Sequence, residues 1–150
     1  MPLTRDEDIA ELLANARTIA MIGASDRPDR PSYGVMRFLQ SHGYRVIPVN
    51  PQITGEHVLG EFVWRELAQI GEPIDIVDIF RRPEAAGDAV DQAIAAGAKA
   101  VWLQLGIVND EAAARAEAAG LRVVMDRCIK LEIVRLRIQS VERSLDITDS

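Results

Sequence analysis

The sequence has little of what a disulfide framework, a metal cage or a membrane span requires. Cys128 is the only cysteine among 150 residues, which excludes internal disulfides and cysteine-based metal cages and is typical of a reducing compartment. No apolar run approaches the ~20 residues of a spanning helix. The N-terminus opens on charged residues rather than on an apolar signal core. We therefore expect a cytoplasmic protein with no membrane partner.

Positive charge is also scarce. The formal net charge is -6, and lysine occurs only at Lys99 and Lys130. Nucleic-acid affinity rests largely on lysine and arginine side chains that neutralise phosphates, and no basic stripe with interleaved aromatic residues is present. We therefore expect no nucleic-acid partner. Several arginines fall directly after apolar segments, and this local placement matters more than the net charge.

Length and composition indicate one ordinary globular domain. A chain of 150 residues can bury one core, and its 48% apolar and 27% charged residues are close to globular averages. We expect the domain to span residues 1–137, including an N-terminal helix within residues 1–16. Residues 138–150 are polar enough to form a loosely held C-terminal tail.

Short apolar runs alternate with segments of helical spacing along the chain. The runs have the length of strands buried on both faces and cover residues 19–22, 45–49, 75–80, 100–105 and 121–125. The helical segments cover residues 32–43, 64–70, 83–97, 109–120 and 129–137. Ser32 and Asn109 are predicted N-caps, and Pro83 stands where the first residue of a helix is expected.

This alternation predicts an α/β fold built from right-handed βαβ units. We expect a Rossmann-like, doubly wound, parallel five-stranded sheet of order 3-2-1-4-5 with helices on both faces. Ligands of such sheets bind outside the carboxyl ends of the strands, where the strand order reverses. The predicted reversal lies between strands one and four.

The loop after the first strand has the chemistry of a phosphate site. Gly23 lets the backbone approach a ligand closely, and the helix that follows Ser25 offers unpaired N–H groups and a positive dipole end to an anion. We interpret the loop as a nucleotide site. In the alternative interpretation, Gly23 only permits a tight exit from the strand.

Two common nucleotide signatures are missing. The later glycines of G-x-G-x-x-G are not at the required spacing, and Asn50 stands where a NAD site usually has an acid for the ribose. The G-x-x-x-x-G-K-[ST] loop of nucleoside triphosphatases is absent as well. A NAD-linked oxidoreductase is therefore a weak alternative, and a generic phosphate-bearing ligand remains.

Arg81 and Arg82 follow the third strand and precede the helix at Pro83, so they either clamp an anion or form a solvated pair. His42 and His57 lack a partner pattern for metal ligation or a catalytic relay. Ser25 lacks the context of a nucleophile elbow. We expect neither catalytic residues nor a metal.

Six strings in fixed order carry a family resemblance between residues 16 and 136. They are I-G-A-S, R-P-S-Y-G-V-M, V-I-P-V-N-P, D-I-V-D-I-F-R-R, A-K-A-V-W-L-Q-L-G and V-V-M-D-R-C-I-K. Together they closely resemble the stand-alone CoA-binding domain family, which is similar to the N-terminal domain of the succinyl-CoA synthetase alpha subunit.

The resemblance implies a coenzyme A site at the carboxyl ends of the strands. It assigns contacts with the cofactor to Gly23, Ala24, Ser25, Asn50, Pro51, Phe80, Arg81, Arg82, Gln104, Leu105 and Gly106, and a wall beside the phosphates to Arg30, Ser32 and Tyr33. The ligase subunits carry a cysteine near the position of Cys128, which adds Cys128 to the predicted site and suggests a mixed disulfide with the CoA thiol.

The resemblance does not imply catalysis by this chain. The ligase relatives depend on a phosphorylated histidine in a further domain and on a partner subunit, and His42 and His57 do not lie in a matching context. We therefore expect non-catalytic binding of coenzyme A or an acyl-CoA. The alternative is a CoA-binding component of an acyl-CoA ligase or transferase assembly. A homodimer is the default expectation for the oligomeric state.

Overall fold

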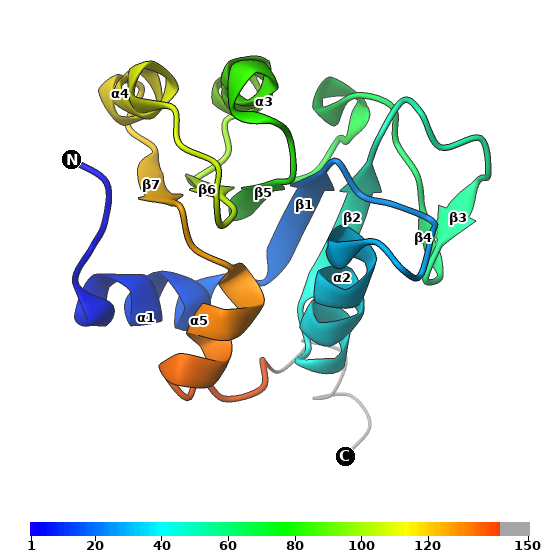
Figure 1. Ribbon diagram of the computed structural model, residues 1–150, viewed down its shortest axis with the longest axis horizontal. Coiled ribbons are helices and arrows are strands. Elements are labelled where there is room, and N and C mark those ends of the chain that lie inside the picture. Colours follow the sequence, from blue (N-terminus) through cyan, green and yellow to red (C-terminus); the bar gives the residue numbers. More distant parts are fainter. Residues whose placement is uncertain (142–150) are drawn as a thin grey trace.

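The computed structural model describes residues 1–141 and has at its centre a five-stranded parallel sheet (Figure 1). All four ladders of this sheet are parallel, in the order β2-β1-β5-β6-β7. The strands are β1 (Thr18–Ile22), β2 (Arg45–Val49), β5 (Ile76–Ile79), β6 (Ala100–Leu103) and β7 (Arg122–Met125). The predicted Rossmann-like α/β fold is confirmed.

The predicted strand order, 3-2-1-4-5, is wrong at one end of the sheet. The third strand of the prediction, β5, pairs with β1 and β6, so β2 lies at the edge. Pro48 explains the arrangement, because a residue without an N–H is tolerated on an edge strand. The Pro48 carbonyl accepts the Trp64 N–H at 3.0 Å, beyond the edge. The order therefore reverses between β1 and β5, not between strands one and four.

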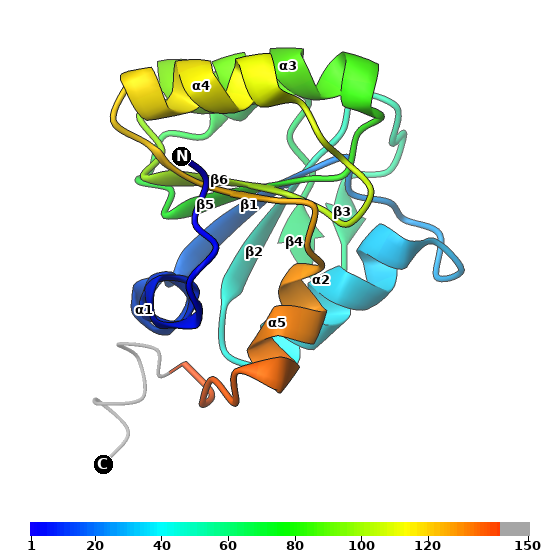
Figure 2. The same cartoon turned by 60° about the vertical axis from the view of Figure 1, so that its left-hand side comes forward.

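Helices cover both faces of the sheet, as predicted (Figures 1 and 2). On one face lie α1 (Asp6–Asn15), α2 (Pro31–Ser41) and α5 (Ile129–Arg135), which pack on Met21 and Trp102 among other core residues. On the other lie α3 (Pro83–Ala95) and α4 (Asp110–Ala118), whose buried residues are mostly alanines. Within residues 1–141, none of these helices has the length and apolar character needed to cross a membrane.

The starts of three helices decide which groups face the sheet edge. Pro83 is the first residue of α3, and the Asn109 Oδ1 accepts the Ala112 N–H at 3.0 Å to cap α4, both as predicted. Ser32 is not a cap. Helix α2 begins at Pro31 after an N-cap at Arg30, because the proline fixes the first helical φ one residue earlier. Ser32 is therefore a buried first-turn residue.

The segment between β2 and β5 differs most from the prediction. It holds an antiparallel pair, β3 (His57–Val58) and β4 (Glu61–Phe62), and only a short 3₁₀ turn, Leu67–Gln69, in place of the helix predicted over residues 64–70. Gln69 causes this: its Oε1 accepts the backbone N–H groups of residues 65 and 66. Trp64 is left extended and pairs with the edge of β2.

The predicted C-terminal tail begins in contact with the domain. The Val141 N–H donates to the His42 carbonyl at 2.8 Å, and His42 Nε2 donates to the Ile138 carbonyl at 2.7 Å. His42, which carries no pattern for catalysis, is therefore a half-buried residue at the end of α2. The rest of the predicted tail, residues 142–150, lies outside the described residues.

Candidate cofactor-binding site

A cavity of about 770 Å³ opens at the carboxyl ends of β1, β2, β5 and β6. The first turns of α2 and α5 complete its walls. The cavity lies where the strand order reverses, between β1 and β5, which is the position that doubly wound sheets use for ligands. Its volume falls within the range of about 300–1,000 Å³ that cofactor and ligand sites occupy.

Gly23 begins the loop between β1 and α2 in a conformation that favours glycine. Its φ is +90°, and its N–H donates to the Val49 carbonyl at 3.0 Å. A Cβ atom at this position would lie 2.0 Å from the Phe80 carbonyl oxygen. The close approach of the β1 and β5 ends therefore requires the glycine. The tight exit from the strand is therefore present, and the phosphate-binding role of the loop stays a prediction.

Asn50 joins the end of β2 to this loop. Its Nδ2 donates to the Ala24 carbonyl at 2.7 Å, and its Oδ1 accepts the Gln52 N–H at 2.8 Å. The Ser25 Oγ accepts the Arg27 N–H at 3.0 Å, which fixes the next turn of the loop. The Asn50 amide is thus committed to main-chain groups on both sides, so this side chain shapes the cavity wall.

Four arginines line the cavity, from the loops after β1 and β5. Arg27 forms a long, exposed ion pair with Asp29. Within residues 1–141, Arg30, Arg81 and Arg82 form no ion pair with a carboxylate. Burial lowers the pKa of Arg81, and the negative charge of Asp88 opposes this shift in part. A half-buried guanidinium without a carboxylate at contact distance is suited to a ligand anion.

The N-termini of two helices reinforce this positive region. Arg30, Pro31 and Ser32, at the start of α2, line the cavity, and Arg82 is the N-cap residue of α3. The first N–H groups of a helix and the positive end of its dipole favour an anion at this place. The arrangement can therefore hold phosphate groups by arginine forks and helix N–H groups together.

The side of the cavity formed by the loop after β6 and by the start of α5 is largely apolar. Leu105, Ile107, Cys128 and Leu131 line it. The Gly106 N–H donates to the Asp126 Oδ1 at 2.7 Å, which fixes the loop after β6 against the loop after β7. The Gln104 side chain is turned into the protein, where its Oε1 accepts the Ile129 N–H at 3.1 Å. Gln104 therefore positions the start of α5.

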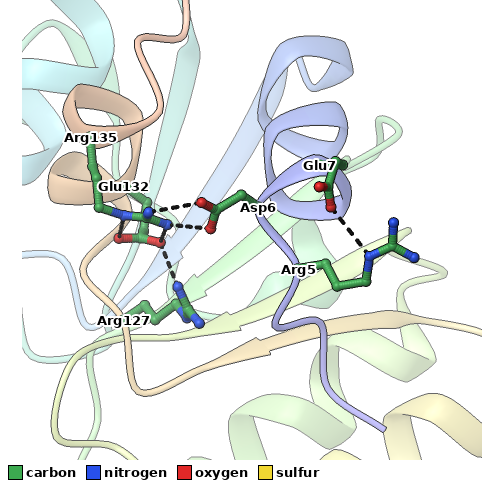
Figure 3. Close-up of polar contacts among 6 residues, drawn as sticks. All are labelled: Arg5, Asp6, Glu7, Arg127, Glu132 and Arg135. Carbon is green, nitrogen blue, oxygen red and sulfur yellow. Dashed lines mark hydrogen bonds and ion pairs between the residues drawn. The ribbon is translucent and has the colours of Figure 1, made fainter.

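An ion-pair network holds α5 in place beside α1 (Figure 3). The buried Glu132 Oε1 lies 2.8 Å from the Nη1 of Arg127 and 2.8 Å from the Nη2 of Arg135, and Arg135 also contacts the Asp6 Oδ1 at 2.8 Å. The Arg135 hydrogen bond lowers the pKa of Glu132, burial opposes it, and Arg127 lowers it further. The network orients the helix that brings Cys128 and Leu131 to the cavity.

One acid lies buried in the central strand below the cavity. Asp78 of β5 is paired in register with Met21 and Trp102 and is fully buried. Neither of its carboxyl oxygens has a hydrogen-bond partner among the described residues. Burial raises the pKa of Asp78 well above its ordinary value. An unpaired buried charge is costly, so the neutral acid is the favoured form.

Twelve of the fifteen predicted site residues line this one cavity: Gly23, Ala24, Ser25, Arg30, Ser32, Asn50, Phe80, Arg81, Arg82, Gln104, Leu105 and Cys128. Pro51 and Gly106 do not line it, and Tyr33 lines a separate cavity with Arg37 and Lys130.

Sequence reasoning missed Gln52, Ile53 and Leu131, which also line the cavity. Leu131 follows Cys128 by three residues on α5, so helical spacing could have found it. Ile53 has no comparable signal, because the Arg65 Nη1 brings its loop into place by donating to the carbonyl of Pro51 at 2.7 Å.

Comparison with known proteins is consistent with the cofactor-like geometry. Residues 17–133 match a family described as CoA binding domain. A Bacillus subtilis (strain 168) protein, the uncharacterized protein YneT, is 41% identical over 124 residues, which is 83% of this chain and 90% of that protein.

Two solved structures place the fold in different settings. A hypothetical protein from Pyrococcus horikoshii OT3 is 42% identical, with a TM-score of 0.85 over 91% of this chain and 96% of its own. The dinucleotide forming acetyl-coenzyme A synthetase 1 of Ca. Korarchaeum cryptofilum is 24% identical, with a TM-score of 0.69 over 77% of this chain and 27% of its own. The second likeness is one of fold, within part of a larger enzyme.

Proposed function

We propose, because the chain belongs to the CoA binding domain family, that it binds coenzyme A or an acyl-CoA in the cavity at the carboxyl ends of its strands without catalysing a reaction. The observation that carries this proposal is that one cavity is lined both by the Gly23 loop and by three arginines, Arg30, Arg81 and Arg82, that form no ion pair with a carboxylate of residues 1–141.

The positively charged groups of the cavity are suited to the phosphates of coenzyme A. Coenzyme A carries a pyrophosphate and a further phosphate on its ribose, so its site needs positive charge spread over several groups. Arg30 and Arg82 are the N-cap residues of α2 and α3. Arg81 directly precedes Arg82 in the loop after β5 and is half-buried. Arginine forks and helix N–H groups are the usual means of holding such anions.

Asn50, at the end of β2, favours CoA over NAD as the ligand of the cavity. A NAD site uses an acid at this place to bind the ribose hydroxyls, whereas Asn50 donates to Ala24 and accepts from Gln52. Both ends of the amide are therefore used within the protein. The ligand proposed here has no need of an acid at that position.

The lining chemistry supports binding rather than catalysis. The titratable side chains that line the cavity are Asp26, the four arginines and Cys128. General acid–base catalysis needs a titratable group held within hydrogen-bond reach of the proton that moves. Among the described residues, the one carboxylate that lines the cavity is the exposed Asp26, which lies in the same loop as Arg27 and Arg30. Within residues 1–141, no cluster of His, Cys, Asp and Glu could hold a metal ion.

Cys128 adds a covalent possibility to the same proposal. Its half-buried thiol lines the largely apolar side of the cavity. As a thiolate it would attack a sulfur of oxidised CoA, the CoA disulfide: the CoA S–S bond breaks, a Cys128–CoA disulfide forms, and one CoA thiolate leaves. This exchange balances without another oxidant.

Native mass spectrometry of freshly purified protein tests the proposal. We expect a mass increment equal to CoA or an acyl-CoA, and after incubation with CoA disulfide an adduct that reductant removes. A Cys128→Ser variant should keep the non-covalent increment and lose the reducible adduct. No CoA increment at saturating CoA would overturn the proposed ligand, and turnover of acyl donors by the purified chain would overturn the non-catalytic role.

A further inference from the structure

Two leucines beside the cavity are far more exposed than core leucines. Leu105 is 64% exposed and Leu131 is 56% exposed, and both are lining residues. Leu105 belongs to the loop after β6 and Leu131 to α5, so two residues 26 positions apart in the chain line the same cavity. The Ile129 N–H, which donates to the Gln104 Oε1 at 3.1 Å, joins the start of α5 to the end of β6. With the nearly buried Ile107 and the Cys128 thiol, the two leucines form an apolar surface, which we name the leucine end.

Paired apolar side chains at the mouth of a binding cavity indicate an apolar occupant, since a ligand group that covers them removes apolar surface from water. The four lining arginines belong to the loops after β1 and β5, and none of them to the loop after β6 or to α5. A CoA molecule whose phosphates contact those arginines has its other end free to extend along the β6 side. The leucine end is where the sulfur and its acyl group would lie.

The charges around the leucine end favour an uncharged acyl group. Arg127 is engaged by Glu132 at 2.8 Å. The Nζ of Lys130 lies over the Phe38 ring, 5.4 Å from its centroid, in a different cavity. The nearby carboxylate of Asp126 is held against Gly106. A terminal carboxylate on the acyl group would thus lose hydration beside the leucines and gain no free cation there from residues 1–141.

We propose that the leucine end receives the aliphatic chain of an acyl-CoA, so that the protein prefers CoA thioesters of uncharged aliphatic acids over free CoA and over thioesters of dicarboxylic acids. This inference rests on the proposed binding of CoA and adds the substrate class. Each methylene that becomes buried contributes a factor of about four in affinity. If two methylenes of a six-carbon acyl chain become buried against the leucines, the thioester should therefore bind more than about tenfold more tightly than CoA.

Isothermal titration calorimetry with CoA, hexanoyl-CoA and succinyl-CoA tests the inference on the full chain under reducing conditions. Hexanoyl-CoA should bind about tenfold more tightly than CoA, and succinyl-CoA no more tightly than CoA. A Leu131→Gln variant should lose most of the hexanoyl advantage, measured as the ratio of its affinity for hexanoyl-CoA to its own affinity for CoA. Val134→Gln is the matched control, because Val134 is 58% exposed on the same helix but does not line the cavity.

The outcomes separate the two proposals. If CoA itself does not bind, the proposed function fails and the acyl preference falls with it. If CoA binds but hexanoyl-CoA gains nothing, or succinyl-CoA gains as much, only the acyl inference is wrong. If Leu131→Gln weakens CoA and hexanoyl-CoA equally, the leucine end holds another part of CoA, such as its adenine, and the inference is again overturned.

Discussion

The Asn50 Nδ2 donates a 2.7 Å hydrogen bond to the Ala24 carbonyl and so ties the end of β2 to the loop after β1. A carboxylate cannot donate this bond, and it would place a negative charge against a carbonyl oxygen. Asn50→Asp should lower the free energy of unfolding by about 1–3 kcal/mol and weaken CoA binding, as measured by urea unfolding and calorimetry. Gln139→Glu supplies the same charge change on an exposed residue outside the cavity.

NAD affinity gained by Asn50→Asp would contradict the account. A NAD site uses an acid at the end of the second strand to bind the ribose, whereas Asn50 is proposed here to hold the loop after β1 in place.

Gly23 can be tested against a glycine of similar backbone conformation. Gly23→Ala should lower the free energy of unfolding by well over 1 kcal/mol, because φ is +90° and the new Cβ would lie 2.0 Å from the Phe80 carbonyl oxygen. Gly106→Ala has a φ of +86° but no atom within 4 Å of its Cβ, so only the backbone cost remains. Equal losses in chemical denaturation would show that the β1 and β5 ends are not in close contact.

Arg81 and Arg82 should carry much of the phosphate attraction. Replacing both with alanine should weaken CoA binding about a hundredfold or more, since charged hydrogen bonds contribute about 1.5–3 kcal/mol each. The dependence of affinity on salt should flatten as well. Arg37→Ala is the control, because Arg37 lies outside the cavity. Unchanged affinity at low salt would assign both arginines to a solvated role.

Asp78 should make the protein less stable as the pH rises. Because burial raises its folded pKa well above 3.8, the folded state keeps a proton that the unfolded chain releases. The free energy of unfolding then falls by up to about 1.4 kcal/mol per pH unit between the unfolded and folded pKa values. Asp78→Asn should remove this slope in denaturation curves, whereas the exposed Glu111→Gln should not. An unchanged slope in Asp78→Asn would contradict a neutral Asp78.

Unlike Asp78, Glu132 should make the protein more stable as the pH rises. Its pKa is lowered by the Arg135 hydrogen bond against the effect of burial, with help from Arg127. Its stabilisation is therefore present above the ordinary pKa and is lost as the pH falls through the lowered folded pKa. Glu132→Gln should cost about 1–3 kcal/mol at neutral pH and little in acid.

The control for Glu132 is visible in the same view (Figure 3). Glu7 pairs with Arg5 at 3.2 Å with both side chains 73% exposed, and exposed pairs contribute little. Glu7→Gln should therefore change the free energy of unfolding very little. A loss in Glu132→Gln no larger than in Glu7→Gln would mean that the network does not hold α5.

The sequence predicts the fold class and most of the cavity because both follow from local patterns. Apolar runs of strand length give the five strands, and their carboxyl ends must meet at one edge of a parallel sheet, which brings Gly23, Asn50, Arg81 and Gln104 together. The strand order depends on long-range pairing. Pro48 could have indicated that its strand lies at the edge of the sheet, because a proline in the interior would leave a ladder position without an N–H donor.

Besides the strand order, the directions of individual side chains could not be predicted from local sequence patterns. Gln104 follows its strand as predicted, yet its amide turns inward to Ile129, while Tyr33, two residues into α2, faces a separate cavity. Both directions are set by how α2 and α5 pack on the sheet. The helical expectation over residues 64–70 failed for a related reason, because Trp64 pairs with the edge of β2.

Calorimetric titration of the reduced, ligand-free protein with CoA and, separately, with NAD decides whether the cavity is a CoA site. We expect saturable binding of CoA at one site per chain, weakened by salt and by the loss of Arg81 and Arg82, and no comparable binding of NAD. Saturable binding of NAD with no binding of CoA would contradict the proposed function.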